Sequence, residues 1–191
     1  MSQFKPKRSV SVDGRPIYVF DDLLDKKIID EVTNALSVAP FTHTEIARPD
    51  VGAYRHWAFN MPLDKAKDLP LVQKANDVIA SLFDNKYRLY RCYCNVASHG
   101  DMLYPHTDCM PNAKEMTALW FIQDEWNFEW GGETIFYNKE DDAEVVVTPK
   151  PGRLAIFDGA IKHAGNAPHK VCTKPRYTFA LKYELIPRTS S

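Results

Sequence analysis

Apolar residues recur every three or four positions in two segments of the first half of the chain. Residues 24–36 carry leucine, isoleucine and valine at this spacing, which predicts an amphipathic helix that ends before Pro40. Residues 69–83 follow the same spacing and predict a second helix. A short run rich in β-branched and aromatic residues, 15–20, precedes the first helix and predicts a strand.

The pattern changes near residue 86, where short strand-like runs follow one another between turn residues. Eight such runs within about a hundred residues predict an antiparallel sandwich or barrel of the jelly-roll kind. The fold class we expect is therefore mostly β with flanking helices, around a double-stranded β-helix (jelly-roll) core. The expected strands are residues 87–96, 102–105, 116–123, 134–137, 144–147, 154–157, 161–164 and 176–185.

No internal repeat, low-complexity stretch or linker divides the chain, so we expect a single domain over residues 1–191. Residues 1–14 are polar and are expected to be loose. Residues 15–85 would supply a strand and supporting helices, although 41–62 mix aromatic and charged residues without a clear period. Residues 86–187 would form the jelly-roll core.

Composition excludes several kinds of partner. The apolar fraction of 45% and the charged fraction of 26% are typical of a folded soluble protein. A formal net charge of −1 offers no basic field for nucleic acid, and no run of about 18 apolar residues could cross a membrane. The four cysteines form no CxxC pair, which favours a reduced, cytoplasmic protein. We expect a small-molecule substrate, no nucleic acid and no membrane; the oligomeric state stays open.

The segment Tyr104-Pro-His-Thr-Asp108 is a candidate metal site. His106 and Asp108 alternate at the end of an expected strand, so both can turn toward one point, and His163 lies on a later strand. Two imidazoles and one carboxylate suit a facial triad for Fe(II), and also suit Mn, Co, Ni or Zn. A His-x-Asp pair alone is a weak signal, which the downstream histidine strengthens.

Arg176 begins the last expected strand, and Thr178 follows on the same strand face. A guanidinium with a hydroxyl at this spacing can bind a carboxylate through several hydrogen bonds. Without the metal ligands, an arginine in a surface ion pair would be the better interpretation.

Several short motifs share an order and an approximate spacing between residues 86 and 185. They are residues 100–101, 106–108, 130–134, 149–153 and 157–159, followed by His163 and 176–178. Together they resemble the catalytic domain of the 2-oxoglutarate- and Fe(II)-dependent dioxygenases of the prolyl 4-hydroxylase-like group.

The resemblance implies roles for individual residues. His106, Asp108 and His163 would bind iron, and Arg176 would pair with the distal carboxylate of 2-oxoglutarate, assisted by Thr178. A tyrosine on the first barrel strand touches that carboxylate in many relatives, and Tyr93 is the candidate here.

The resemblance also implies Fe(II), 2-oxoglutarate and O2 as cofactor and co-substrates, with succinate and CO2 as products. Halogenases of this fold have a small residue in place of the carboxylate, so Asp108 favours hydroxylation or a related oxidation of a C–H bond.

The substrate is less evident from the sequence. No peptide- or nucleic-acid-binding domain is added to the core, which favours a small metabolite or natural-product intermediate. Candidate substrate residues are Arg55 and Trp57, in a segment that could form a lid, and Trp126 in another aromatic loop. Three alternatives remain: a peptidyl or prolyl hydroxylase, a cupin-type metalloprotein that does not use 2-oxoglutarate, and a non-catalytic jelly-roll binding protein.

Overall fold

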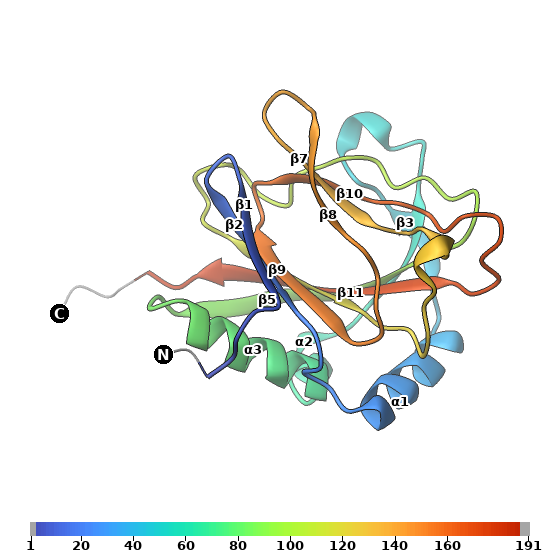
Figure 1. The fold of residues 1–191 in the computed structure, drawn as a ribbon, viewed down its shortest axis with the longest axis horizontal. Helices are drawn as coiled ribbons and strands as arrows, with labels where there is room; N and C mark the ends of the chain where they lie inside the picture. The colour runs from blue at the N-terminus through green and yellow to red at the C-terminus, as the bar shows by residue number, and fades with distance from the viewer. Residues whose placement is uncertain (1–2, 188–191) are drawn as a thin grey trace.

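Two antiparallel β-sheets face each other in the computed structural model, which describes residues 3–187 (Figure 1). From edge to edge the larger sheet contains β1 (Arg8–Val12), β2 (Arg15–Phe20), β9 (Arg153–Asp158), β6 (Met116–Phe121), β11 (Arg176–Leu185), β5 (Tyr87–Ala97), β4 (His56–Asn60) and β3 (Thr42–Glu45). The smaller sheet contains β10 (Lys162–Gly165), β7 (Thr134–Tyr137) and β8 (Ala143–Val147).

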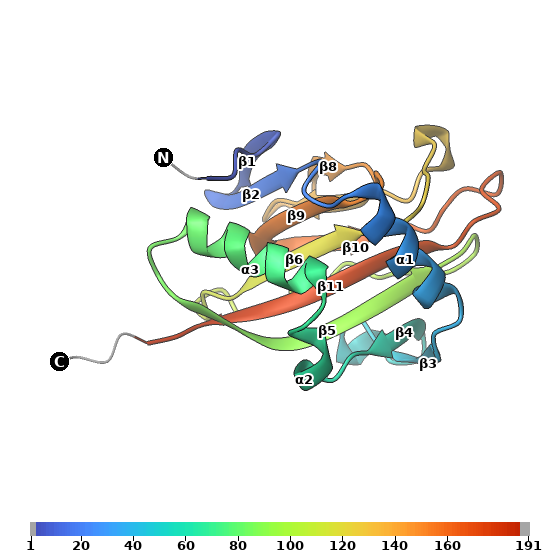
Figure 2. The same cartoon turned by 90° about the horizontal axis from the view of Figure 1, so that it is seen from below.

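Helices cover the face of the larger sheet that is turned away from the smaller one (Figure 2). These helices are α1 (Lys26–Ser37), the short α2 (Leu63–Ala66) and α3 (Pro70–Leu82). Two 3-10 turns, η1 (Pro49–Val51) and η2 (Phe128–Trp130), lie in loops. Apolar helix residues such as Leu36 and Val72 pack against the sheet around Trp120, whose indole nitrogen donates to the Leu71 carbonyl. No helix within residues 3–187 has the length and apolar character needed to cross a membrane.

The central strand β11 is buried on both faces. One face packs under the helices and the other points between the two sheets, where Phe121, Phe136 and Phe157 form part of a second apolar cluster. The outer face carries Tyr177, Phe179, Leu181 and Tyr183. The inner face carries Arg176, Thr178, Ala180 and Lys182. Two cationic side chains therefore lie inside the barrel.

The structure corrects the expectation that residues 1–14 are loose. Residues 8–12 form β1, which pairs with β2 through a tight turn. Asp13 and Gly14 both have positive φ, as this kind of hairpin turn requires, and Val12 is buried between the sheets. Residues 1 and 2 lie outside the described part of the chain.

Two further segments differ from the expected pattern. Residues 102–105 form no strand, and only an isolated bridge between His106 and His163 remains at that place. The irregular stretch 41–62 instead contains a hairpin, in which β3 and β4 pair with a register shift between His43 and Glu45. That hairpin adds to the edge of the larger sheet beside β5.

Candidate metal centre

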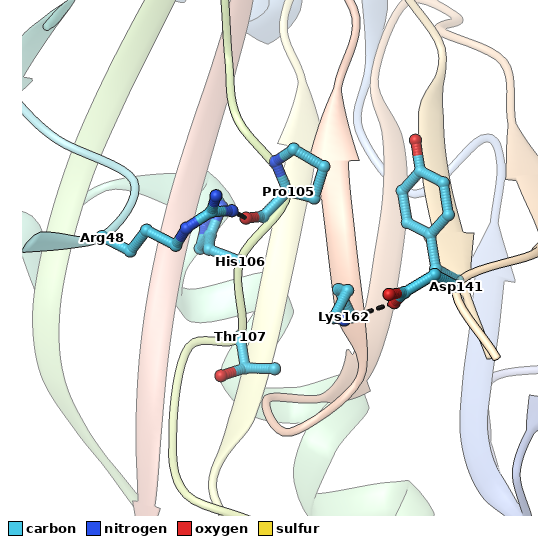
Figure 3. Close-up of a pocket in the computed structure, with 7 residues that line it drawn as sticks. Arg48, Pro105, His106, Thr107, Asp141 and Lys162 are labelled. Carbon is cyan, nitrogen blue, oxygen red and sulfur yellow. Dashed lines mark hydrogen bonds and ion pairs between the residues drawn. The ribbon is translucent and has the colours of Figure 1, made fainter. Parts of the chain in front are cut away.

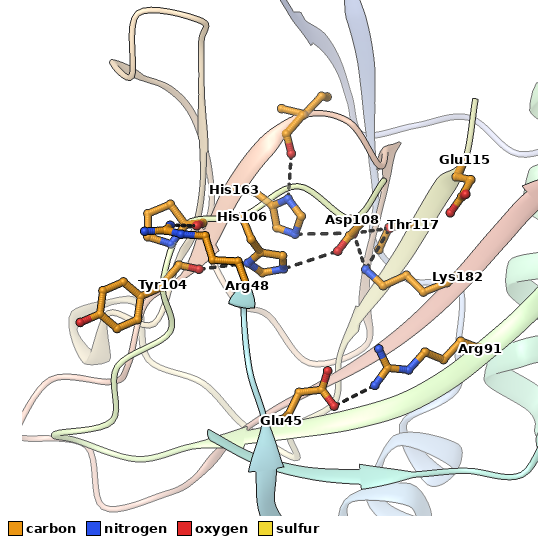
Figure 4. Close-up of polar contacts among 12 residues, drawn as sticks. Glu45, Arg48, Arg91, Tyr104, His106, Asp108, Glu115, Thr117, His163 and Lys182 are labelled. Atoms are coloured by element: carbon orange, nitrogen blue, oxygen red, sulfur yellow. Dashed lines mark hydrogen bonds and ion pairs between the residues drawn. The ribbon is translucent and has the colours of Figure 1, made fainter. Parts of the chain in front are cut away.

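Backbone hydrogen bonds bring His106, Asp108 and His163 together. His106 and His163 lie directly opposite each other, each amide donating to the other's carbonyl at 3.0 and 2.9 Å. Two residues later the amide of Asp108 donates to the carbonyl of Gly159 at 2.7 Å, in the turn that leads into β10. The three side chains therefore share one mouth of the barrel (Figure 4).

One potential ligand atom from each of the three residues lies within 4.8 Å of the other two. The Nε2 atoms of His106 and His163 lie 3.4 and 3.7 Å from the oxygens of Asp108. The side chains of His163 and Asp108 are only 8% and 6% exposed, and that of His106 is 24% exposed at the mouth. The predicted ligand set is thus close enough to hold a single metal ion.

The protonated nitrogen of each imidazole is determined by a backbone carbonyl. Nδ1 of His106 is 3.0 Å from the Tyr104 carbonyl, and Nδ1 of His163 is 2.9 Å from the Ile161 carbonyl. Because a carbonyl only accepts, Nδ1 carries the hydrogen, and Nε2 of the neutral ring keeps a free lone pair. Both Nε2 atoms face Asp108, as a metal site requires.

Electrostatics favours a neutral His163 and an ionised Asp108. Burial lowers the pKa of His163 to about 4, with the charges of His106 and Lys182 acting in the same direction and Asp108 opposing them. Burial alone would raise the pKa of Asp108, but Lys182, His163 and His106 together hold it well below its usual range. At neutral pH the cluster therefore offers a neutral imidazole at His163 and an ionised carboxylate.

Lys182 is a buried cation in contact with the candidate ligand Asp108, a position that sequence reasoning missed. Its ammonium pairs with Oδ2 of Asp108 and also donates to the Thr117 hydroxyl at 3.1 Å (Figure 4). Burial would lower the pKa of Lys182, but the Asp108 carboxylate raises it, so the lysine stays charged.

Arg176 lies at the other end of the same inner face of β11. Its guanidinium donates to the Gly132 carbonyl at 2.5 Å and to the Thr134 hydroxyl at 3.0 Å, and it lies 5.3 Å from the Phe121 ring centre. Burial lowers the pKa of Arg176 to about 10, still well above neutrality. No carboxylate in residues 3–187 forms an ion pair with it, so its hydrogen-bond partners are all neutral, and the charge of Glu133 acts on its pKa only from beyond contact distance.

Thr178 and Asn95 lie between Arg176 and the metal cluster along the paired strands. Thr178 is directly opposite Asn95, whose amide oxygen is buried without a hydrogen-bond partner. Tyr93 lies one step further, opposite Ala180, and its ring is 5.8 Å from the Lys182 ammonium. Asn95 is therefore closer in register to Arg176 than the predicted Tyr93 is, and the contact of Tyr93 with a co-substrate stays a prediction.

A cavity of about 190 Å³ opens onto the cluster. The β3–β4 hairpin forms one wall, and Glu45 of this hairpin accepts a hydrogen bond at 2.8 Å from Arg91 on β5. The lining residues are mostly polar, among them Glu45, His56, Arg91, Tyr93, Asn95 and Lys182. The cavity wall beside the cluster is therefore mostly polar.

A second cavity, of about 550 Å³, lies on the other side of His106 (Figure 3). Arg48 closes one end by donating to the Pro105 carbonyl at 2.5 Å. Lys162 and Asp141 form an ion pair at the other end. Both cavities share His106 and Thr107, so the cluster has open space on two sides.

The three predicted substrate residues lie outside both cavity linings. Trp57 points outward and stacks on His43, at 4.9 Å between ring centres, and Arg55 is exposed. Trp126 instead covers Gly132 near Arg176, and its indole donates to the Gly131 carbonyl at 3.1 Å. Their contact with substrate stays a prediction.

His56 and Glu45 occupy the wall of the smaller cavity, and both were missed. Strand alternation could have indicated His56 once the neighbouring Trp57 was placed outward.

A sequence profile of the 2OG-Fe(II) oxygenase superfamily matches residues 89–183, from β5 to β11. The chain belongs to this superfamily. No curated protein sequence matches it. Fe(II), 2-oxoglutarate and O2 are the cofactor and co-substrates of the family, so those predictions are confirmed and the chain is an iron- and 2-oxoglutarate-dependent oxygenase. The cupin-type and non-catalytic alternatives are thereby excluded.

Solved structures of 2OG-Fe(II) oxygenases share the fold. The epimerase SnoN, in complex with Fe3+, α-ketoglutarate and nogalamycin RO, is 14% identical, with a TM-score of 0.66 and coverage of 88% of this chain and 78% of that chain. A Trichoplax adhaerens prolyl hydroxylase, in complex with a hypoxia inducible factor peptide, is 20% identical, with a TM-score of 0.65 and coverage of 88% and 83%.

HygX from Streptomyces hygroscopicus, with nickel and 2-oxoglutarate bound, is 12% identical. Its TM-score is 0.64, with coverage of 88% of this chain and 82% of that chain. These similarities confirm the mostly β, jelly-roll fold of this oxygenase and its likeness to prolyl hydroxylases.

Proposed function

We propose that this oxygenase binds Fe(II) through His106, Asp108 and His163 and hydroxylates an unactivated C–H bond of a small, polar metabolite or natural-product intermediate. The observation that carries the proposal is the cluster itself. Two imidazoles, whose Nδ1 atoms face backbone carbonyls, and one ionised carboxylate offer ligand atoms that lie within 4.8 Å of one another. This donor set suits Fe(II).

Arg176 and Thr178 are proposed to bind the distal carboxylate of 2-oxoglutarate. A buried guanidinium with only neutral partners is costly unless an anion joins it, and a dicarboxylate supplies that anion. The side chain of Asn95 supports the same assignment. Its amide lacks one hydrogen-bond partner, and an amide can turn by 180° to offer its donor to a ligand oxygen.

When bound, Fe(II) with 2-oxoglutarate and O2 supplies an oxidant able to break a C–H bond, with succinate and CO2 as by-products. The chain's own residues orient the reactants and enclose them. The carbonyls of Tyr104 and Ile161 hold the two imidazoles in one tautomer. Asp108 fills the place that a halide would need, which favours hydroxylation, and the β3–β4 hairpin limits the access of water.

The smaller cavity supports a small polar substrate. Its volume of about 190 Å³ leaves room for a compact molecule, and its walls carry Glu45, Arg91 and Tyr90. Charged and hydroxyl groups there can pair with polar groups of a substrate, whereas a purely apolar substrate would leave them unpaired.

A peptidyl or prolyl hydroxylase is the second candidate. The larger cavity beside His106 favours it, because about 550 Å³ of further space adjoins the cluster. A side chain could reach the cluster while the rest of a peptide occupied that cavity.

The decisive experiment is a screen for succinate release that depends on substrate. Protein loaded with Fe(II) is incubated with 2-oxoglutarate, O2 and either pooled small metabolites or proline-containing peptides. We expect metabolite pools to stimulate succinate formation in the wild type and in His43→Ala, which removes an exposed histidine outside the cluster. His106→Ala should show no stimulated release.

Stimulation by peptides alone would favour the second candidate. Turnover that survives in His106→Ala would refute the proposed metal site.

A further inference from the structure

The two carboxylate oxygens of Asp108 have different surroundings. Oδ2 accepts a hydrogen bond from the Thr117 hydroxyl at 2.5 Å and pairs with the Lys182 ammonium. Oδ1 faces Nε2 of His106 at 3.4 Å, and Nε2 of His163 lies 3.7 Å from Oδ2. Oδ2 is therefore engaged by two protein donors, whereas Oδ1 faces His106 and accepts from neither Thr117 nor Lys182.

The sheet register builds this arrangement. Lys182 on β11 lies directly opposite Thr117 on β6, so their side chains rise side by side toward Asp108. The lysine ammonium donates to the Thr117 hydroxyl at 3.1 Å, which leaves the hydroxyl hydrogen for Asp108. All three groups are nearly fully buried, so water does not compete for Oδ2.

We propose that Lys182 and Thr117 are positioning residues, which hold Oδ2 of Asp108 so that only Oδ1 is available to the metal. This inference rests on the proposed iron site and goes beyond it, because it assigns a role to two residues outside the ligand set. It explains why a charged lysine occupies the barrel interior, where an apolar residue would pack at lower cost.

Holding Oδ2 would limit the number of coordination positions that Asp108 occupies on the metal. A carboxylate can bind a metal through one oxygen or through both. If His106, Asp108 and His163 each supplied one ligand atom, more coordination positions would remain for 2-oxoglutarate and O2 than if Asp108 supplied both oxygens. Releasing Oδ2 should therefore weaken the binding of 2-oxoglutarate more than the binding of the metal.

The test uses Ni(II)-loaded protein, because nickel binds such a site without turnover. Calorimetry gives the dissociation constants of Ni(II) and of 2-oxoglutarate, and X-ray absorption at the nickel edge gives the number of ligand atoms. Thr117→Val removes one donor without changing shape or charge, and Thr117→Ser restores it. Lys182→Met removes the other donor, and Lys182→Arg retains a cation.

We expect the 2-oxoglutarate dissociation constant to rise about 10- to 100-fold in Thr117→Val and in Lys182→Met, the same range in which losing a partner of a metal ligand lowers metal affinity or activity. Nickel should still bind, with one more oxygen ligand in its spectrum. Thr117→Ser and Lys182→Arg should remain near the wild type. If Lys182→Met does not fold, Thr117→Val alone decides.

Arg88→Met is the control for charge. Arg88 lies on β5 opposite Glu184 of β11, outside the cavity lining, and forms an exposed ion pair with Glu184. A loss of 2-oxoglutarate affinity in Arg88→Met equal to that in Lys182→Met, or an unchanged ligand number in Thr117→Val, would overturn the inference. Failure of the wild type to bind nickel or 2-oxoglutarate would instead refute the proposed function.

Discussion

At the scale of single residues, the barrel interior holds two buried cations that differ in their partners. Lys182 has a carboxylate partner in Asp108, whereas the direct partners of Arg176 are a carbonyl and two hydroxyls. A buried charge without a directly paired counter-charge lowers stability, and the fold would lose little by replacing it. The position of Arg176 is therefore better explained by a ligand than by folding.

Arg176→Met tests this explanation. We expect it to weaken binding of 2-oxoglutarate to the Ni(II)-loaded protein by about 2–5 kcal/mol, the cost of removing one partner of a buried charged hydrogen-bonded pair. Nickel affinity should not change, because Arg176 lies away from the metal ligands on β11. Calorimetry measures both constants in one preparation. Equal 2-oxoglutarate affinity in the variant and the wild type would contradict the assignment.

At the scale of elements, the turn between η2 and β7 shapes the site of Arg176. Gly132 has a φ of +78°, and a Cβ there would lie 3.1 Å from Cδ of Arg176 and 3.1 Å from the Trp126 ring. Any larger residue would press on the guanidinium arm. This turn therefore requires glycine both for its backbone conformation and for the close approach of Arg176.

Gly132→Ala should lower 2-oxoglutarate affinity about tenfold by displacing Arg176, and Gly14→Ala is its matched control. Gly14 has a nearly equal φ of +76°, but a Cβ there meets nothing within 4 Å. Both variants should lose about 1 kcal/mol of unfolding free energy from backbone strain. Only Gly132→Ala should also lose co-substrate affinity in calorimetry. Equal affinity in the two variants would show that the contact with Arg176 has no effect on binding.

A second element contact joins the end of β2 to β9. Arg153 donates to both oxygens of Asp21, at 2.7 and 2.9 Å, and to the Thr148 carbonyl at 2.8 Å. The hydrogen bonds from Arg153 lower the pKa of Asp21 below its usual value, against the opposing effect of burial. Because the folded-state pKa is lowered, the stabilisation is complete above the unfolded-state pKa near 4 and is lost as the pH falls through the folded-state pKa.

Arg153→Met should therefore lower the unfolding free energy at pH 7 by about 1.5–3 kcal/mol, the range for hydrogen bonds to charged groups. Urea denaturation across the pH range measures it, and the difference from the wild type should shrink as the pH falls below about 4. Arg88→Met is the control, because its ion pair with Glu184 is exposed and should contribute less than about 1 kcal/mol. A difference independent of pH would contradict the role of Asp21.

At the scale of the whole molecule, periodicity predicted both long helices and seven of the eight expected strands, whose patterns are regular. Periodicity did not predict that Lys182 is buried. The alternation along β11 indicates one apolar face and one face in solvent, and Lys182 lies on the second. The second face is instead covered by the smaller sheet, a long-range contact that local pattern does not reveal. The strand predicted at 102–105 is wrong for a related reason: its local pattern is strand-like, but whether a segment pairs depends on tertiary contacts, and the bridge to β10 begins only at His106.

That His106, Asp108 and His163 lie close together could be predicted because these residues are chemically distinctive and occur in a known order, and their binding of a metal stays a prediction. The residues that form the cavity walls could not be predicted from the sequence. Glu45 and His56 lie in a hairpin with a register shift, which has no clear alternation in sequence.

Metal binding should stabilise the whole fold, because the proposed ligands come from segments 55 residues apart that meet only in the native state. A ligand that binds only the folded state at 100 times its dissociation constant adds about 2.7 kcal/mol, which in a domain of this size raises the melting temperature by roughly 5–11 °C. Scanning calorimetry with Ni(II) should show this rise in the wild type and in His43→Ala, and none in His106→Ala. A rise of equal size in His106→Ala would place the stabilising metal elsewhere, since that variant lacks one of three ligands while His43 stacks on Trp57 outside the barrel.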